Sequence, residues 1–364
     1  MAYLFTQESN FLWLTGIYEP TWQLILDGKN RRSYLVEPPI SDTTRIFEGA
    51  ADAEYIKKIS RVDEVIQPKD AQVLIKKLSQ EYDTVYSLGP DPRRDHFDFM
   101  LNDGPITQWN ELQHQFKVVK DMRPILAKKR AIKSKYEITS MKKAIDISID
   151  GLRSLKNNLK EQHYEYQLEA QLSHTFRYAG AQGHAYDPIV ASGANACTLH
   201  YTKNNDALPK NGLVLIDAGA RVNGYCADIT RTYAIGTPTK RQIAVHAAVE
   251  KTHHAIIALL GPEKSVKEYH EQVDVIMIEA LKSLGLYKKP ADYRKYFPHA
   301  ISHGLGVDVH DSLGAPTHFK PGMVLTVEPG IYIPEEGIGV RIEDDILITK
   351  TGIENLSGDL PTSM

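Results

Sequence analysis

Apolar side chains recur every three or four residues in several stretches of this chain, the spacing that predicts amphipathic helices. Between positions 122 and 155 the recurring residues form one stripe, made of Met141, Ile145, Ile149 and Leu152. The stretch 265–285 also carries end signals, because Ser265 and Glu268 have capping-box spacing and a glycine closes it. We predict helices in both stretches and at 52–60, 70–82, 164–181 and 239–262.

Short apolar runs bounded by turn residues predict β-strands between these helices. Asn223-Gly224 separates two of the runs and is a strong hairpin signal. The predicted strands are 22–28, 84–89, 212–220, 225–236, 322–333 and 339–349. Together the elements predict an α/β (α+β) protein, and in the first part of the chain their alternation predicts a small sheet covered by helices.

The length of the chain, 364 residues, suits two domains. We place the junction near 121–130, just before the long helix predicted from the Met141 stripe. This gives domains 1–125 and 126–364, of which the second carries four of the six predicted strands.

Charge and cysteine content exclude several partners and locations. Lys and Arg number 43 against 46 Asp and Glu, so the net charge is −3, and nucleic acid is not expected as a partner because phosphate binding needs a concentrated basic surface. The two cysteines, Cys197 and Cys226, form no CxxC pair, which indicates a reducing compartment. The first residues lack the basic region of a signal peptide, and no apolar stretch approaches membrane-spanning length. We therefore expect a cytoplasmic protein with no membrane partner.

Carboxylates occur inside or at the ends of the apolar strands. Asp217 and Glu328 end apolar runs, Asp228 lies among strand residues, and Glu343 lies between isoleucines. Ionised carboxylates are rarely buried unless they are paired or bind a cation. A salt bridge to a buried arginine would explain any single site. Four such sites favour a shared divalent cation.

Histidines and a strand arginine extend this candidate site. The stretch 299–311 contains three histidines, His299, His303 and His310. Side-chain alternation places Arg341 on the strand face of Glu343, so it can reach the same pocket. Carboxylates with one or two imidazoles favour manganese, with cobalt, iron or zinc as alternatives, and four carboxylates favour two metal ions. Elsewhere, His253 and His254 are expected at the surface or edge of their helix, and Cys226 as core filler.

The stretches "LIDAGARVNGYCADITRT", "HAISHGLGVDVHD", "LTVEPGIYI" and "GVRIEDDILIT" occur in this order and resemble the pita-bread metallopeptidases of the creatinase and prolidase type. The likeness runs from about residue 133 to the C-terminus. It is greatest to Xaa-Pro aminopeptidases (aminopeptidase P), and next to prolidases. Five positions match the metal ligands of that family: Asp217, Asp228, His303, Glu328 and Glu343.

The resemblance also implies roles for further residues. His200 and His310 match substrate-side histidines, and His299, Tyr332 and Arg341 match other active-site positions. We expect Glu328, His200, His310 and Arg341 to be catalytic, and His299 and Tyr332 to bind substrate.

The resemblance further implies a fold and an activity. The fold is a small creatinase-like N-terminal α/β domain followed by a pita-bread domain, with a curved antiparallel sheet flanked by helices. The activity is hydrolysis of the Xaa-Pro bond at the free N-terminus of a peptide by a dinuclear centre, most consistent with Mn²⁺. The alternatives are a dipeptidase that cleaves only Xaa-Pro dipeptides and a non-catalytic peptide-binding module. The family also implies a homo-oligomer, a dimer or a tetramer.

Overall fold

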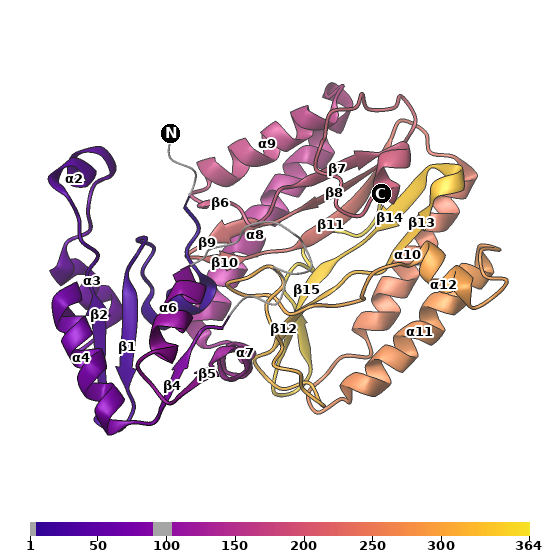
Figure 1. The fold of residues 1–364 in the computed structure, drawn as a ribbon. Helices are drawn as coiled ribbons and strands as arrows, with labels where there is room; N and C mark the ends of the chain where they lie inside the picture. Colours follow the sequence, from indigo (N-terminus) through magenta and orange to yellow (C-terminus); the bar gives the residue numbers. More distant parts are fainter. Residues whose placement is uncertain (1–4, 90–103) are drawn as a thin grey trace. The chain divides into compact units, whose positions relative to one another are not determined.

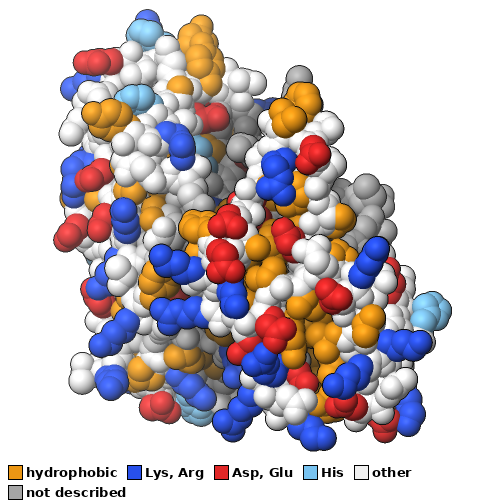
Figure 2. Space-filling model, turned by 90° about the vertical axis from the view of Figure 1, so that its left-hand side faces the viewer, with side chains coloured by type: hydrophobic (Ala, Val, Ile, Leu, Met, Phe, Trp, Pro, Cys, Tyr) orange, Lys and Arg blue, Asp and Glu red, His pale blue; other side chains and the backbone are white. Residues whose placement is uncertain are grey.

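The computed structural model describes residues 5–89 and 104–364 (Figure 1). The chain divides into two units, Met1–Leu126 and Ala127–Met364. Among the described residues, no helix is both long and apolar enough to cross a membrane. On the face seen in Figure 2, basic and acidic side chains are interspersed, in keeping with the nearly balanced charge of the sequence.

The smaller unit contains two small groups of strands with helices beside them. Its strands are β1 (Gln23–Asp27), β2 (Arg32–Val36), β3 (Glu64–Ile66), β4 (Thr84–Ser87) and β5 (Val118–Asp121). Strand β2 pairs antiparallel with β1 and parallel with β3, while β4 and β5 form a parallel pair. Its helices are α1 (Ser9–Thr15), α2 (Asp42–Glu48), α3 (Ala53–Ser60), α4 (Pro68–Glu81) and α6 (Gly104–Gln113). A buried cluster unites strands and helices: Ile17, Trp22, Leu35, Ile56 and Val62.

The larger unit begins within α7 (Arg123–Arg130), and all the strand pairings described in it are antiparallel. One group has the order β11–β8–β7, with β7 (Ile189–Ser192), β8 (Gly212–Ala218) and β11 (Ile229–Ile235). A second has the order β12–β15–β16, with β12 (Val324–Val327), β15 (Asp344–Ile348) and β16 (Ile353–Asn355). Shorter groups are formed by β6 (Gly183–His184), β9 (Ala220–Val222) and β10 (Tyr225–Cys226), and by β13 (Gly330–Ile333) and β14 (Ile338–Arg341).

Two helix pairs lie against these strands (Figure 1). The first pair is α8 (Lys135–Asn158) and α9 (Glu165–Tyr178), which share one apolar cluster with β8 and β11. The second pair is α10 (Lys240–Ile257) and α11 (Val266–Ser283), which share a second apolar cluster with the four strands β12, β13, β14 and β15. A short helix, α12 (Ala291–Tyr296), follows α11. The predicted apolar stripe of α8 is buried, as Met141, Ile145, Ile149 and Leu152 are all at most 4% exposed, and the last three belong to the first cluster. The expected antiparallel sheet flanked by helices is confirmed.

Several local predictions are confirmed and others need correction. Asn223 and Gly224 both have positive φ, as the turn between β9 and β10 requires, and the Ser265 hydroxyl accepts a hydrogen bond from the Glu268 amide. The predicted strand 339–349 is instead two strands, β14 and β15, that belong to different pairings. The prediction that His253 lies at a surface or edge is wrong, because this residue is fully buried on α10.

Candidate metal centre

Four carboxylates at or next to strand ends approach one another because these ends meet at one place. Asp217 lies near the end of β8, and Asp228 lies between β10 and β11. Glu328 follows β12, and Glu343 lies between β14 and β15. Strand β8 pairs with β11, β12 pairs with β15, and the Glu343 amide donates to the Thr230 carbonyl of β11 over 3.0 Å. These links bring the ends of the two strand groups together.

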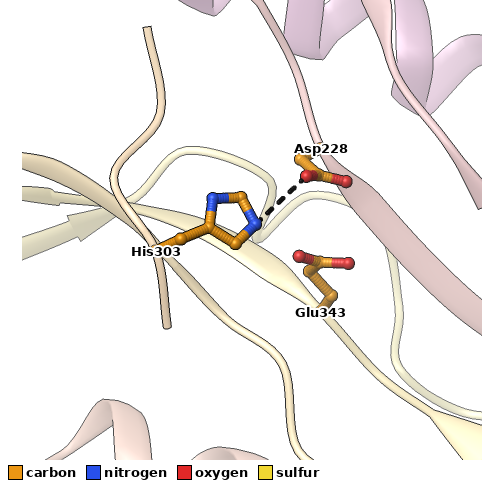
Figure 3. Close-up of side chains that lie close together, drawn as sticks. All are labelled: Asp228, His303 and Glu343. Atoms are coloured by element: carbon orange, nitrogen blue, oxygen red, sulfur yellow. Dashed lines mark ion pairs between the residues drawn. The ribbon is translucent and has the colours of Figure 1, made fainter. Parts of the chain in front are cut away.

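The fifth predicted residue, His303, approaches from a loop that is tied to β12. Its amide donates to the Thr326 hydroxyl, and its carbonyl accepts from the Thr326 amide. The imidazole Nε2 lies 3.4 Å from Asp228 Oδ2 and 3.5 Å from Glu328 Oε1. Donor atoms of Asp228, His303 and Glu343 all lie within 4.8 Å of one another (Figure 3).

Asp217 joins this group through a tyrosine that the sequence analysis missed. The Tyr186 hydroxyl contacts Asp217 Oδ1 and lies 2.6 Å from Asp228 Oδ1, so it bridges two carboxylates. Tyr186 lies in the loop between β6 and β7, where neither periodicity nor spacing indicates a role. Only the fold brings it to the acids.

Arg341 and its partners form one wall of the site. Its guanidinium donates to Asp217 Oδ2 over 2.6 Å, to the Tyr332 hydroxyl over 2.8 Å and to the Thr230 hydroxyl over 3.1 Å. His299 contacts the same tyrosine, with 2.9 Å between Nε2 and the hydroxyl oxygen. The arginine therefore reaches the predicted pocket, where its donors hold side chains of the site.

The remaining two predicted histidines lie in different surroundings. The His310 ring packs against the His303 ring at a centroid distance of 4.3 Å. His200 is exposed. Burial is the main cause that lowers the pKa of His299 to about 4, and Arg341 and His200 are among the smaller causes. The structure thus gathers nine of the ten predicted residues into one group, in which Tyr186 links Asp217 to Asp228, and places His200 at the surface.

Two further residues, which were not predicted as site residues, form hydrogen bonds with the residues that carry the acids. Thr230 donates to Glu343 Oε2 over 2.7 Å. Asp345 is fully buried and accepts a hydrogen bond from the Asp228 amide over 3.1 Å. Strand alternation already places Thr230 on the face of Asp228 and Asp345 on that of Glu343, and this is the signal that could have identified them.

Burial makes the ionised acids costly. It is the main cause that raises the pKa of Asp217 and of Glu343, the latter well above its usual range, and neighbouring carboxylates add to both shifts. Burial likewise raises the pKa of Glu328 to about 7, against the opposing effect of His303. Burial by itself lowers the pKa of His303, but the nearby Asp228 and Glu328 outweigh it and raise that pKa to about 9.

This electrostatic pattern fits a divalent cation. The buried carboxylates raise one another's pKa, and Asp228 and Glu328 raise the pKa of His303, so a positive charge is favoured among them. Oxygen donors with one imidazole nitrogen are a common ligand set for divalent metals. The donors of Asp228, His303 and Glu343 are already gathered within the span that one ion needs. Fold and site together define a metal-binding protein of the kind expected for the pita-bread class.

Comparison with known proteins agrees with this class. The model of metallopeptidase family M24 matches residues 139–350, and that of the aminopeptidase P N-terminal domain matches residues 1–86. The chain belongs to metallopeptidase family M24. The activity of this family depends on divalent metal ions.

Named relatives and solved structures cover nearly the whole chain. A Xaa-Pro aminopeptidase from Haemophilus influenzae is 32% identical, covering 99% of this chain and 87% of its own. A structure described as a putative aminopeptidase P from Bacillus anthracis has a TM-score of 0.87 at 31% identity, covering 99% and 87%. A zinc-substituted aminopeptidase P from Escherichia coli in complex with product has a TM-score of 0.83 at 32% identity, covering 99% and 88%. The expected pita-bread fold is confirmed.

Proposed function

We propose that this protein is a Xaa-Pro aminopeptidase, which hydrolyses the bond before a proline in second position of a peptide with a free N-terminus. The observation that carries the proposal is the convergence of Asp228, His303 and Glu343. Glu328 lies 3.5 Å from His303, and Tyr186 links Asp217 to Asp228. Relatives bearing this name match the chain over almost its full length.

Five residues would hold two divalent ions: Asp217, Asp228, His303, Glu328 and Glu343. Manganese is the metal that the carboxylate-rich donor set favours, with cobalt, iron or zinc as alternatives. The bound ions would supply Lewis-acid polarisation of the scissile carbonyl and a water acidic enough to attack near neutral pH. The zinc-substituted relative from Escherichia coli supports a site that accepts more than one metal.

Replacement of a central ligand tests this assignment. The Asp228→Asn variant removes a charged ligand. Loss of a hydrogen-bond partner of a metal ligand lowers metal affinity by roughly 10- to 100-fold, and we expect this variant to lose more Mn²⁺ affinity than that. Isothermal titration with Mn²⁺ measures the loss. Asp150→Asn, at an exposed carboxylate on α8, is the matched control and should bind as the unmodified protein does. Unchanged affinity in Asp228→Asn contradicts the assignment.

The other polar groups would move protons and hold the peptide. Glu328 takes the proton of the attacking water and passes it toward the proline nitrogen, which has to be protonated to leave. His200 and His310 stabilise the charge that develops on the carbonyl oxygen and orient the peptide. His299 and Tyr332 contact the substrate, and Arg341 orients Asp217 and Tyr332, to which it already donates.

The proposed reaction is tested with matched peptides. Metal-depleted protein supplied with Mn²⁺ is expected to convert Ala-Pro-Ala into alanine and Pro-Ala, measured by mass spectrometry. Ala-Ala-Ala should stay intact, and omission of the metal should abolish cleavage. Cleavage of Ala-Pro alone would indicate the dipeptidase instead. Intact Ala-Pro-Ala and Ala-Pro in excess Mn²⁺, Co²⁺ or Zn²⁺ would support the non-catalytic binding module. Cytoplasmic location and a homo-oligomeric state stay predictions.

A further inference from the structure

One carboxylate of the larger unit is completely buried at a place outside the metal centre. Glu165, the first residue of α9, has no exposed surface. Its Oε1 accepts hydrogen bonds from the Ser192 amide over 2.8 Å, the Ser192 hydroxyl over 2.8 Å and the Asn195 side-chain amide over 3.2 Å. Its Oε2 accepts from the Tyr201 hydroxyl over 2.9 Å and the Asp206 amide over 3.0 Å. Neutral donors thus replace the water lost on burial.

All five donors belong to one segment, residues 192–206, here named the His200 loop. Glu165 contacts the first residue of this loop, the last one and two between them. Its own backbone amide donates to the Asp206 carbonyl over 3.0 Å. One side chain therefore binds four residues of a 15-residue segment whose regular structure is the last residue of β7 and a short 3₁₀ helix, Gly193–Cys197.

The next turn of α9 reinforces the same loop. Glu169 accepts a hydrogen bond from the Asn204 side chain over 2.9 Å. The same side chain donates to the Pro188 carbonyl and accepts from the Val190 amide, so it ties the loop to β7. Asn204 has positive φ, a conformation that asparagine tolerates better than most residues.

The His200 loop packs against the wall of the metal centre. Cys197, Leu199 and Tyr201 lie against a buried cluster that contains Tyr332. The Cys197 thiol donates to the Ile338 carbonyl on β14, the strand that ends at Arg341. A Cβ at Gly339 would lie 2.1 Å from the Ala196 carbonyl oxygen, so loop and strand are in close contact.

We infer that Glu165 is a positioning residue that fixes the His200 loop, and through it His200 and Tyr332, at the substrate side of the metal centre. The inference rests on the proposed function, because it assigns those two residues to the peptide. Tyr201 links the two features directly, since its hydroxyl binds Glu165 and its neighbour in sequence is His200. Preorganisation of this wall reduces the ordering cost of substrate binding.

The Glu165→Gln variant isolates the effect of the carboxylate. Glutamine keeps the length and shape of the side chain. When its amide nitrogen points toward Tyr201 and Asp206, however, it is a donor that faces two other donors, so neither hydrogen bond can form. Hydrogen exchange at the Asp206 amide is expected to speed up by at least about 10-fold, the equivalent of one lost bond of this kind. This measurement uses no metal and no substrate, so it remains decisive even when the proposed activity fails.

Kinetics then test whether the carboxylate acts through the loop histidine. Glu165→Gln should lower kcat/KM for Ala-Pro-Ala by about 10- to 100-fold. In a His200→Ala background the same change should have a clearly smaller effect, because the residue being positioned is already gone. Glu161→Gln, at an exposed glutamate just before α9, is the control and should leave exchange and kinetics unchanged.

Two results overturn the inference: an Asp206 amide as protected in folded Glu165→Gln as in the unmodified protein, or an equal loss of kcat/KM with and without His200. When Glu165→Gln does not fold, Tyr201→Phe replaces it and removes only one of the five donors. Tyr201→Phe is expected to lower kcat/KM by about 5- to 15-fold, as one uncharged partner of a carboxylate is lost. Unchanged kinetics in this variant also count against the inference.

Discussion

The Glu328→Gln variant is expected to lose about 100- to 10,000-fold in kcat toward Ala-Pro-Ala, the contribution of a well-placed proton-transfer group. Its position supports this role, because Glu328 lies 3.5 Å from both His303 and His299 and its burial raises its pKa to about 7. An amide at the same place can still offer an oxygen to a metal but cannot take the proton.

Metal content has to be measured alongside the rate, because Glu328 is also a proposed ligand. If elemental analysis shows that the variant retains both ions, the loss in kcat is due to impaired proton transfer. If metal is lost, the variant shows that Glu328 is a ligand. Glu354→Gln, at an exposed glutamate paired with Lys142, is the control and should keep full activity. A metal-loaded Glu328→Gln protein with near-normal kcat would remove the residue from the mechanism.

The Arg231→Met variant is expected to lower the free energy of unfolding of the larger unit by about 3–5 kcal/mol, the usual cost of breaking a buried ion pair. Arg231 is fully buried and uses all five of its donors. They contact Asp344 over 2.7 Å and four backbone carbonyls, those of Thr230, Glu343, Leu360 and Pro361. Methionine keeps the bulk but removes the positive charge beside Asp344 and the donors that bind the four carbonyls.

The distribution of tryptophan provides an internal control for this measurement. All three tryptophans, Trp13, Trp22 and Trp109, lie in the smaller unit. Urea unfolding followed by tryptophan fluorescence should therefore be unchanged in Arg231→Met, while the transition followed by circular dichroism shifts to lower urea. Arg153→Met, at an exposed arginine of α8, should shift neither. A decrease in the free energy of unfolding of less than about 1 kcal/mol would show that the buried pair contributes little to stability, a result known for some other buried pairs.

The strand and helix pattern predicted much of this protein because local rules decide it. The buried stripe of α8, the turn at Asn223-Gly224 and the cap of α11 follow from spacing and backbone preference within a few residues. The candidate ligands were predictable for a related reason. A carboxylate that ends an apolar strand is conspicuous wherever it occurs, as at Asp217 and Glu328.

Other features depend on partners far away in the chain. The prediction for His253 was wrong because a histidine on a helix carries no local sign of burial. Here it faces Asp344 at 3.4 Å, next to Arg231 on a different element. The predicted continuous strand 339–349 is likewise broken at Ile342 and Glu343, because its halves pair with different strands.

The sequence by itself predicted candidate metal ligands and the elements that carry them, from residue type, short-range periodicity and the likeness to a known family. Only the tertiary structure decided what holds those residues in place: Tyr186 between two aspartates, Arg341 against Asp217, and Glu165 beneath the His200 loop. The physical reason is that these hydrogen bonds join groups up to 124 positions apart. No local pattern records them, and they form only when the packing of strands and helices has removed the competing water.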